Sequence, residues 1–250
     1  MNPLRSLFPE VGAGGFSHLD DSVHFYGRIH ALLTPDALVV DYGAGRGRGI
    51  VDDPVAYRRS LRTLKGRCRK LIGLDPDPAV LTNPGLDEAY VIELDKPLPL
   101  ADKSVDLIVS DYTFEHIENA EFVAAELDRI LKPGGWICAR TPNRWGYIGI
   151  ATTLIPNNWH VSILRRVQSE RKAIDVFPTT YPLNTRRALL RHFPNGRFQH
   201  CSYAHFCEPG YFGKSTLLWR IVLASGRLTP SFMAPVWLIF MQKRIDTERK

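Results

Sequence analysis

The sequence lacks the features of a membrane-spanning or secreted protein. No apolar run approaches the eighteen residues that a bilayer requires, because Arg220 and Arg227 interrupt the nearest candidate, residues 217–228. The first fifteen residues lack the apolar core of a signal peptide. The four cysteines form no Cys-x-x-Cys pair, so we expect free thiols, no disulfide framework and no metal site. These absences predict a cytoplasmic protein.

What the sequence contains is ordinary for a globular enzyme or binding protein. Its 250 residues are 44% hydrophobic and 23% charged, which predicts a single domain over residues 1–250 with a substantial core. The formal net charge of +6 favours an anionic partner but identifies none.

Short apolar runs alternate with helical patterns through the first part of the chain. Such runs are typical of strands covered on both faces, here at residues 37–43, 70–75, 89–94, 105–111 and 135–141. The clearest helix follows Asn119, a suitable cap, and should stop at Pro133 and Gly134. This alternation predicts an α/β fold with a doubly wound, mostly parallel sheet.

The pattern changes after residue 142. Residues 143–183 and 205–235 lack a strand period and predict inserted caps, the second with a helix from about 214 to 225. A helix capped by Asn184 or Thr185 lies between them. Residues 197–203 and 236–243 predict two last strands that pair antiparallel at the sheet edge.

Glycines alternate after the first strand, in VVDYGAGRGRG at residues 39–49. A dinucleotide-binding loop needs Gly-x-Gly-x-x-Gly and an acid about twenty residues further on. Here Gly43, Gly45 and Gly47 alternate, Arg48 takes the place of the third glycine, and Asp75 lies too far along. An acid at Asp41 would repel a pyrophosphate but suit an amino group or a sulfonium.

Four motifs in order resemble the class I S-adenosylmethionine-dependent methyltransferases, particularly the bacterial small-molecule type (methyltransferase type 11-like). They are VVDYGAGRGRG, IGLDPDP, LPLADKSVDLIVSDYTFEHI and LKPGGWICARTPN, within a cofactor-binding core at residues 37–142. The resemblance implies a Rossmann-like sheet of seven strands with an antiparallel last strand. It also implies S-adenosyl-L-methionine as cofactor.

The resemblance further implies which residues bind that cofactor. Asp75 would grip the ribose hydroxyls, Pro76 would lie beside the adenine, and Asp111 and Tyr112 would lie under the methionine portion. The glycine motif contributes Asp41, Gly43, Ala44, Gly45 and Gly47. Asp95 is favoured slightly over Glu93 and Leu94 as the acid near the adenine. Asp75 and Asp111 have an alternative role as helix caps.

The chain departs from the family after the glycine loop. Asp53 and Pro54 indicate that the next helix starts late, where members often enter a helix at once.

A general base is needed only for a hydroxyl or amine acceptor, and histidine suits it near neutral pH. His116 and His160 are the candidates, although a structural role for His116 is equally well supported. The acceptor is expected to be a small molecule, or a glycan or other secondary metabolite. Nucleic acid is not expected, because SDYT lacks the Asn/Asp-Pro-Pro-Tyr pattern of enzymes that methylate DNA amino groups.

Two other functions compete. A non-catalytic sensor or scaffold would keep the cofactor fold, and an NAD-dependent dehydrogenase would need the spacing that Arg48 breaks. The apolar residues of 211–221, with Lys214 and Arg220, allow contact with anionic lipid. Packing of this segment over the sheet edge, or a homodimer contact, is the favoured interpretation.

Overall fold

The structure is a computed structural model that describes residues 3–147, 179–213, 215–226 and 228–245. A mixed sheet lies at its centre, with the strand order β3-β2-β1-β4-β5-β8-β6 and with β7 also paired to β8. The strands are β1 (Leu38–Tyr42), β2 (Lys70–Asp75), β3 (Glu88–Val91), β4 (Val105–Asp111), β5 (Leu131–Pro142), β6 (Phe198–His200), β7 (Tyr203–His205) and β8 (Val236–Lys243).

Strand directions follow the sequence prediction. The neighbours among β1 to β5 pair in parallel, and β8 pairs antiparallel with β5, β6 and β7. The antiparallel last strand therefore lies between β5 and the sheet edge, as the α/β interpretation expected.

The sheet has eight strands rather than seven because its edge strand is interrupted. The backbone amide of Cys201 donates to the carbonyl of Phe240 at 2.8 Å, and the backbone amide of Phe240 donates to the Ser202 hydroxyl at 3.1 Å. A side chain thus replaces a backbone group in the ladder, while the register with β8 stays the same on both sides, with His200 opposite Met241 and Tyr203 opposite Leu238. The single strand predicted at 197–203 is divided into β6 and β7.

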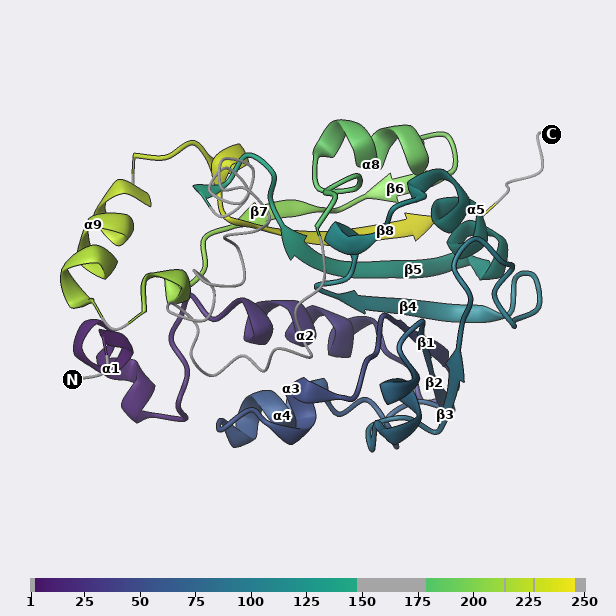
Figure 1. Ribbon diagram of the computed structural model, residues 1–250, viewed down its shortest axis with the longest axis horizontal. Coiled ribbons are helices and arrows are strands. Elements are labelled where there is room, and N and C mark those ends of the chain that lie inside the picture. The colour runs from purple at the N-terminus through teal and green to yellow at the C-terminus, as the bar shows by residue number, and fades with distance from the viewer. Residues whose placement is uncertain (1–2, 148–178, 214, 227, 246–250) are drawn as a thin grey trace.

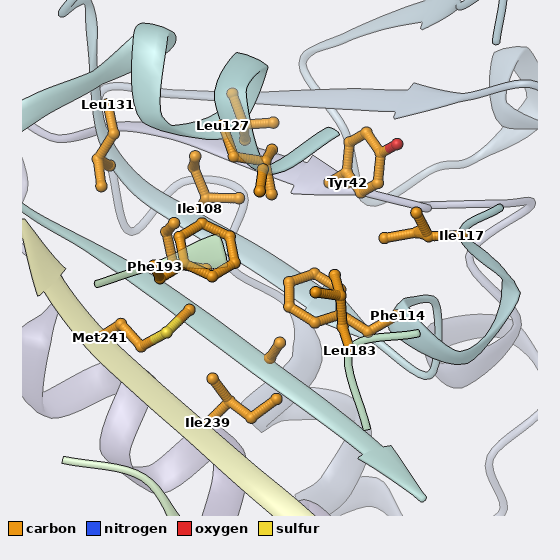
Figure 2. Close-up of a cluster of buried hydrophobic side chains, with 14 of the residues drawn as sticks. Tyr42, Ile108, Phe114, Ile117, Leu127, Leu131, Leu183, Phe193, Ile239 and Met241 are labelled. Carbon is orange, nitrogen blue, oxygen red and sulfur yellow. The ribbon is translucent and has the colours of Figure 1, made fainter. Parts of the chain in front are cut away.

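Helices cover both faces of the sheet (Figure 1). On one face, α2 contributes Phe25 and Ile29 to a core with Val39, Leu107 and Phe240. On the other face α5 and α8 pack over the sheet (Figure 1), and Figure 2 shows Leu127 and Phe193 on either side of Ile108. The helices are α1 (Pro3–Leu7), α2 (Asp21–Leu32), α3 (Arg48–Val51), α4 (Ala56–Arg62), α5 (Ala120–Ile130), α8 (Arg186–His192) and α9 (Thr216–Gly226).

Short 3-10 turns complete the described elements: η1 (Pro9–Gly12), η2 (Pro78–Thr82), η3 (Phe114–His116), η5 (Gly210–Phe212) and η6 (Ser231–Met233).

Local capping agrees with most of the helix predictions. Asn119 caps α5 by accepting from the amide of Phe122, and Thr185 rather than Asn184 caps α8. Helix α5 ends at Ile130, earlier than Pro133, because Leu131 already pairs with Val105 in the sheet. The expectation of a late helix after the glycine loop is only partly right. The four-residue α3 begins at Arg48, immediately after Gly47, and the longer α4 follows.

The segment between β7 and β8 carries α9, close to the predicted position of a helix. Trp219 of α9 packs with Phe8 and Val11 of the N-terminal segment in a separate apolar cluster, and α9 and α1 lie together at one end of the molecule (Figure 1). None of the helices in the described part of the chain is long and apolar enough to span a membrane. Of the predicted cap at 143–183, residues 148–178 lie outside the described part.

Candidate functional site

The parallel register brings three strand ends together at one edge of the sheet. Tyr42 pairs with Leu74, and Asp41 pairs with Val109. The residues that follow β1 therefore lie between Asp75, the last residue of β2, and Asp111, the last residue of β4. The carboxyl edge of an open parallel sheet is where such folds bind ligands.

The loop after β1 turns on three glycines in the left-handed region. Gly43, Gly45 and Gly47 have φ angles of +81°, +47° and +74°. A Cβ at position 43 would lie 2.1 Å from Oγ1 of Thr113, so no side chain fits there. At Gly45 the nearest atom is 4.0 Å away, an Oδ2 of Asp75, which leaves open space beside the backbone. The loop thus offers a bare backbone surface next to a carboxylate.

Asp75 is held by two backbone amides. Oδ2 accepts from Gly45 at 2.8 Å, and Oδ1 accepts from Asp77 at 2.8 Å. Burial raises the pKa of Asp75 above its ordinary value, although these two amides oppose the shift. The helix-cap alternative is not what the structure shows, because the cap of η2 is Asp77. Asp75 instead faces the glycine loop.

Asn83 fixes the glycine loop from outside. Its side-chain amide donates to the carbonyls of Ala44 and Gly45, at 3.1 Å each, and its Oδ1 would meet a Cβ at position 47 at 2.4 Å. Sequence reasoning missed this residue, because a lone asparagine before a proline carries no motif. Ala44 itself is half-buried and packs toward Gly73.

Asp41 differs from the other acids of this edge. Its half-buried carboxylate has no hydrogen bond or ion pair with any described residue. Burial, and then the charges of Asp111 and Asp75, raise the pKa of Asp41 to about 7. An unpaired acid in this field favours a cation and disfavours an anion. The site therefore suits a cationic ligand and not a pyrophosphate.

Asp111 is already paired. Both of its oxygens accept from Arg140, Oδ1 from Nε and Oδ2 from Nη2, each at 2.7 Å, and Tyr26 donates to Oδ2 at 3.1 Å. Burial alone would raise the pKa of Asp111, but Arg140 outweighs it and holds the pKa below its ordinary value. The side chain of Asp111 is thus committed within the protein.

Comparisons with known proteins agree with this geometry. A family model for a methyltransferase domain, Methyltransf_11, matches residues 55–139. A Mycolicibacterium smegmatis protein, named as a probable S-adenosylmethionine-dependent methyltransferase, is 29% identical over 157 residues, which cover 57% of this chain and 55% of the relative. The malonyl-[acyl-carrier protein] O-methyltransferase of Methylococcus capsulatus is 33% identical over 118 residues, which cover 45% of this chain and 40% of the relative.

A solved structure extends the likeness to the whole sheet. Geranyl diphosphate C-methyltransferase from Streptomyces coelicolor has a TM-score of 0.53 with this chain, at 16% identity, over 90% of this chain and 77% of the other. Residues 55–139 therefore match the methyltransferase domain family, and the chain has the fold of the solved methyltransferase structure. The chain spans about half the length of the curated relatives it matches. The matched family range begins after the glycine loop, so the loop is assigned from its own geometry.

Arg140 connects the carboxyl edge of the sheet to α2. The guanidinium is buried in β5, donates to the Ser22 hydroxyl at 2.8 Å and lies 3.2 Å from Oδ1 of Asp21. Tyr112, with φ +56°, donates from its hydroxyl to Oδ2 of Asp21 at 2.9 Å, and its ring lies 4.8 Å from the Arg140 guanidinium. The first turn of α2 therefore closes over the ends of β4 and β5. Arg140 was detectable in the sequence as a charge inside an apolar strand, which requires a buried partner.

Two further predicted residues lie near Asp75. Pro76 is exposed directly after β2. Asp95 is exposed at φ +60° and accepts from the side-chain amide of Asn119 at 2.9 Å. Burial, and then the charges of Asp75 and Asp95, raise the pKa of Tyr42 to about 12. Its competitor Glu93 instead pairs with Lys96.

The two histidines have different outcomes. His116 lies in η3, just beyond the end of β4, with Nε2 3.9 Å from Oε1 of the buried Glu115. His160 lies outside the described residues. In the part of the chain that the structure describes, no cluster of potential metal ligands occurs.

A cavity of about 640 Å³ lies away from this edge. It is lined between α5 and α8 by residues that include Asp128, Arg191, Arg197 and Phe198. Because Phe198 pairs with Lys243 and Asp128 lies near the start of β5, this cavity opens at the amino edge of the sheet. The predicted cofactor residues lie at the opposite, carboxyl edge and do not line this cavity.

Proposed function

We propose that the chain transfers a methyl group from S-adenosylmethionine to a small-molecule acceptor. The observation that carries the proposal is Asp41, a carboxylate with no partner among the described residues, on the same sheet edge as Asp75 and the open backbone of Gly45. This arrangement fits a nucleoside with a positive charge at one end. The names of the malonyl-carrier and geranyl diphosphate methyltransferases support a small acceptor, and a glycan or secondary metabolite lies within that class.

The chain's own residues divide the work of binding. Asp75 would hold the ribose hydroxyls, with Pro76 against the adenine and Asp95 near it. Asp41 and the backbone of the glycine loop would hold the cationic methionine end, with Tyr112 and the backbone of Asp111 below. Bound S-adenosylmethionine supplies an electrophilic methyl group, so the protein contributes alignment and the exclusion of water.

Proton removal falls to a histidine where the acceptor is a hydroxyl or an amine. His116 and His160 are the proposed bases, and His116 lies beyond the strand end at which the methionine portion would sit. We expect alanine at His116 or at His160 to slow single-turnover methylation about a hundredfold at saturating substrate. His192→Ala, on α8 near the amino-edge cavity, is the matched control. Unchanged rates for both variants would remove these histidines from the mechanism.

Incubation with methyl-labelled S-adenosylmethionine and a cell extract tests the function. The label should enter the small-molecule fraction with the wild-type protein and not with Asp75→Ala. Calorimetry with S-adenosylmethionine and its demethylated product accompanies this assay. Binding without transfer to any fraction would favour the sensor, and label in nucleic acid would contradict the proposed acceptor class.

A further inference from the structure

The outer surface of α9 is apolar although its inner surface already packs on the protein. Trp219 and Leu223 face the cluster with Phe8 and Val11. Leu217, Leu218 and Ile221 are 68%, 43% and 54% exposed. Their spacing of three and four residues places them on one side of the helix. We name Leu217, Leu218 and Ile221, together with the exposed Leu228 after the helix, the α9 face.

The segment that carries this face has charges of one sign only. Residues 209–235 contain no Asp or Glu, although the chain has 26 of them, and they contain Lys214, Arg220 and Arg227. Arg220 is exposed and forms no ion pair with any described residue, and the same holds for Arg5 on the neighbouring α1. Elsewhere on this protein many arginines are paired, as Arg58 is with Asp20 and Asp53. The exposed apolar side chains of the α9 face therefore lie near Arg220 and Arg5, which have no acidic partner among the described residues.

This combination argues against a second copy of the chain as the partner. A two-fold dimer through the α9 face would bring the same residues of each copy together. Arg220 would then meet the arginine of the partner with no carboxylate from this segment to neutralise it. Exposed apolar side chains flanked by cations instead match a lipid bilayer, which has anionic headgroups at its surface and apolar acyl chains beneath them.

We propose that the α9 face binds the surface of an anionic lipid bilayer. Leu217, Leu218 and Ile221 enter the boundary between headgroups and acyl chains, and Arg220 and Arg5 meet the lipid phosphates. Helix α9 lies parallel to the surface, since an eleven-residue helix is too short to cross it. Each arginine near an anionic surface strengthens binding by about fivefold at low salt. The inference does not depend on the methyl-transfer activity.

Co-sedimentation of the full chain with vesicles tests the proposal. One set of vesicles contains phosphatidylcholine alone and the other includes about a third phosphatidylglycerol. The wild-type protein should pellet with the anionic vesicles, and binding should weaken as salt is raised. The variant with Leu217→Ser and Ile221→Ser should bind at least about tenfold more weakly, because two apolar side chains are lost. Arg220→Gln with Arg5→Gln should lose the preference for anionic lipid.

Ile245→Ser is the matched control. Ile245 is 68% exposed and follows the end of β8, at the opposite end of the molecule from α9 (Figure 1). It should bind vesicles as the wild-type protein does. Equal binding of wild-type protein and the Leu217/Ile221 variant would overturn the proposal, as would absence of lipid-dependent pelleting at low salt. Sedimentation velocity without vesicles gives a further check. If the wild-type protein is a dimer and the two serine substitutions dissociate it, the α9 face binds a second copy of the chain instead of lipid.

Discussion

At the scale of single residues, the site depends on positions where only one residue type fits. Gly43 combines a φ of +81° with a Cβ position 2.1 Å from Oγ1 of Thr113. Asp41 is a carboxylate without a partner in the described part of the chain, in the field of two other acids. Steric contact excludes a side chain at Gly43, and the unpartnered carboxylate of Asp41 lowers the stability of the fold. Substitution of either residue should therefore change the free energy of unfolding.

Gly43→Ala should lower the free energy of unfolding by about 3–5 kcal/mol, because it adds a clash with Thr113 to an unfavourable φ. Gly66→Ala is the matched control, since Gly66 has a φ of +78° and nothing within 4 Å of its Cβ position. The control should lose about 1 kcal/mol. Urea denaturation of both variants measures the difference, and equal losses would show that Thr113 does not restrict the loop.

Asp41→Asn should stabilise the protein at about pH 8. The folded pKa of Asp41 is about 7 and its ordinary value is 3.8, so between these values the folded protein holds a proton that the unfolded chain releases. Wild-type stability therefore falls as pH rises through this window. We expect the variant to gain about 1–3 kcal/mol above pH 7 and little near pH 4. Denaturation across this range checks the sign, and a gain that is largest at low pH would contradict it.

At the scale of elements, the sequence predicted those helices and strands that a local pattern of residues defines. β8 was predicted at its observed bounds, 236–243, because seven of its eight residues are buried and the run is uninterrupted. α5 was found from Asn119 and its apolar spacing. The division of the edge strand at Ser202 and the clasp of Asn83 on the glycine loop were not predictable, because each depends on a contact between residues distant in sequence.

The same limit applies to Asp111. Its position at the end of an apolar run predicts that Asp111 lies at the carboxyl edge of the sheet, and the structure places it there as the last residue of β4. It does not predict that Arg140, from the next strand of the sheet, would take both carboxylate oxygens. The clamp formed by β4, β5 and the first turn of α2 is a property of packed elements, so we expect its loss to affect the whole edge.

Arg140→Met should destabilise the protein by about 3–5 kcal/mol, because it leaves Asp111 buried without its partner. Arg197→Met, which removes an exposed partner of Asp128, should cost less than about 1 kcal/mol. In wild-type protein the lowered pKa of Asp111 gives stability that is present above pH 3.8 and lost on acidification. In the Arg140 variant that pKa should rise instead, so the deficit should shrink at low pH. Chemical denaturation at several pH values measures both effects.

At the scale of the whole molecule, two apolar layers hold the sheet, one on each face. The core clusters on the two faces bury most residues of β1, β4 and β8. Helix α2 reaches this edge from one face and η3 from the other, while α9 and α1 form a separate cluster at the end of the molecule. The surface that we assign to lipid thus belongs to a cluster distinct from the two core layers of the sheet.

The central claim is that this edge binds a cationic nucleoside through Asp41 and Asp75. The most direct measurement is calorimetric titration of S-adenosylmethionine at about pH 6.5, in two buffers of different ionisation enthalpy. Asp41 is mostly protonated there, so a bound cation should lower its pKa and release roughly half a proton or more. The account predicts one site with proton release in the wild-type protein and none in Asp41→Asn. Absence of binding, or equal proton release from both proteins, would contradict it.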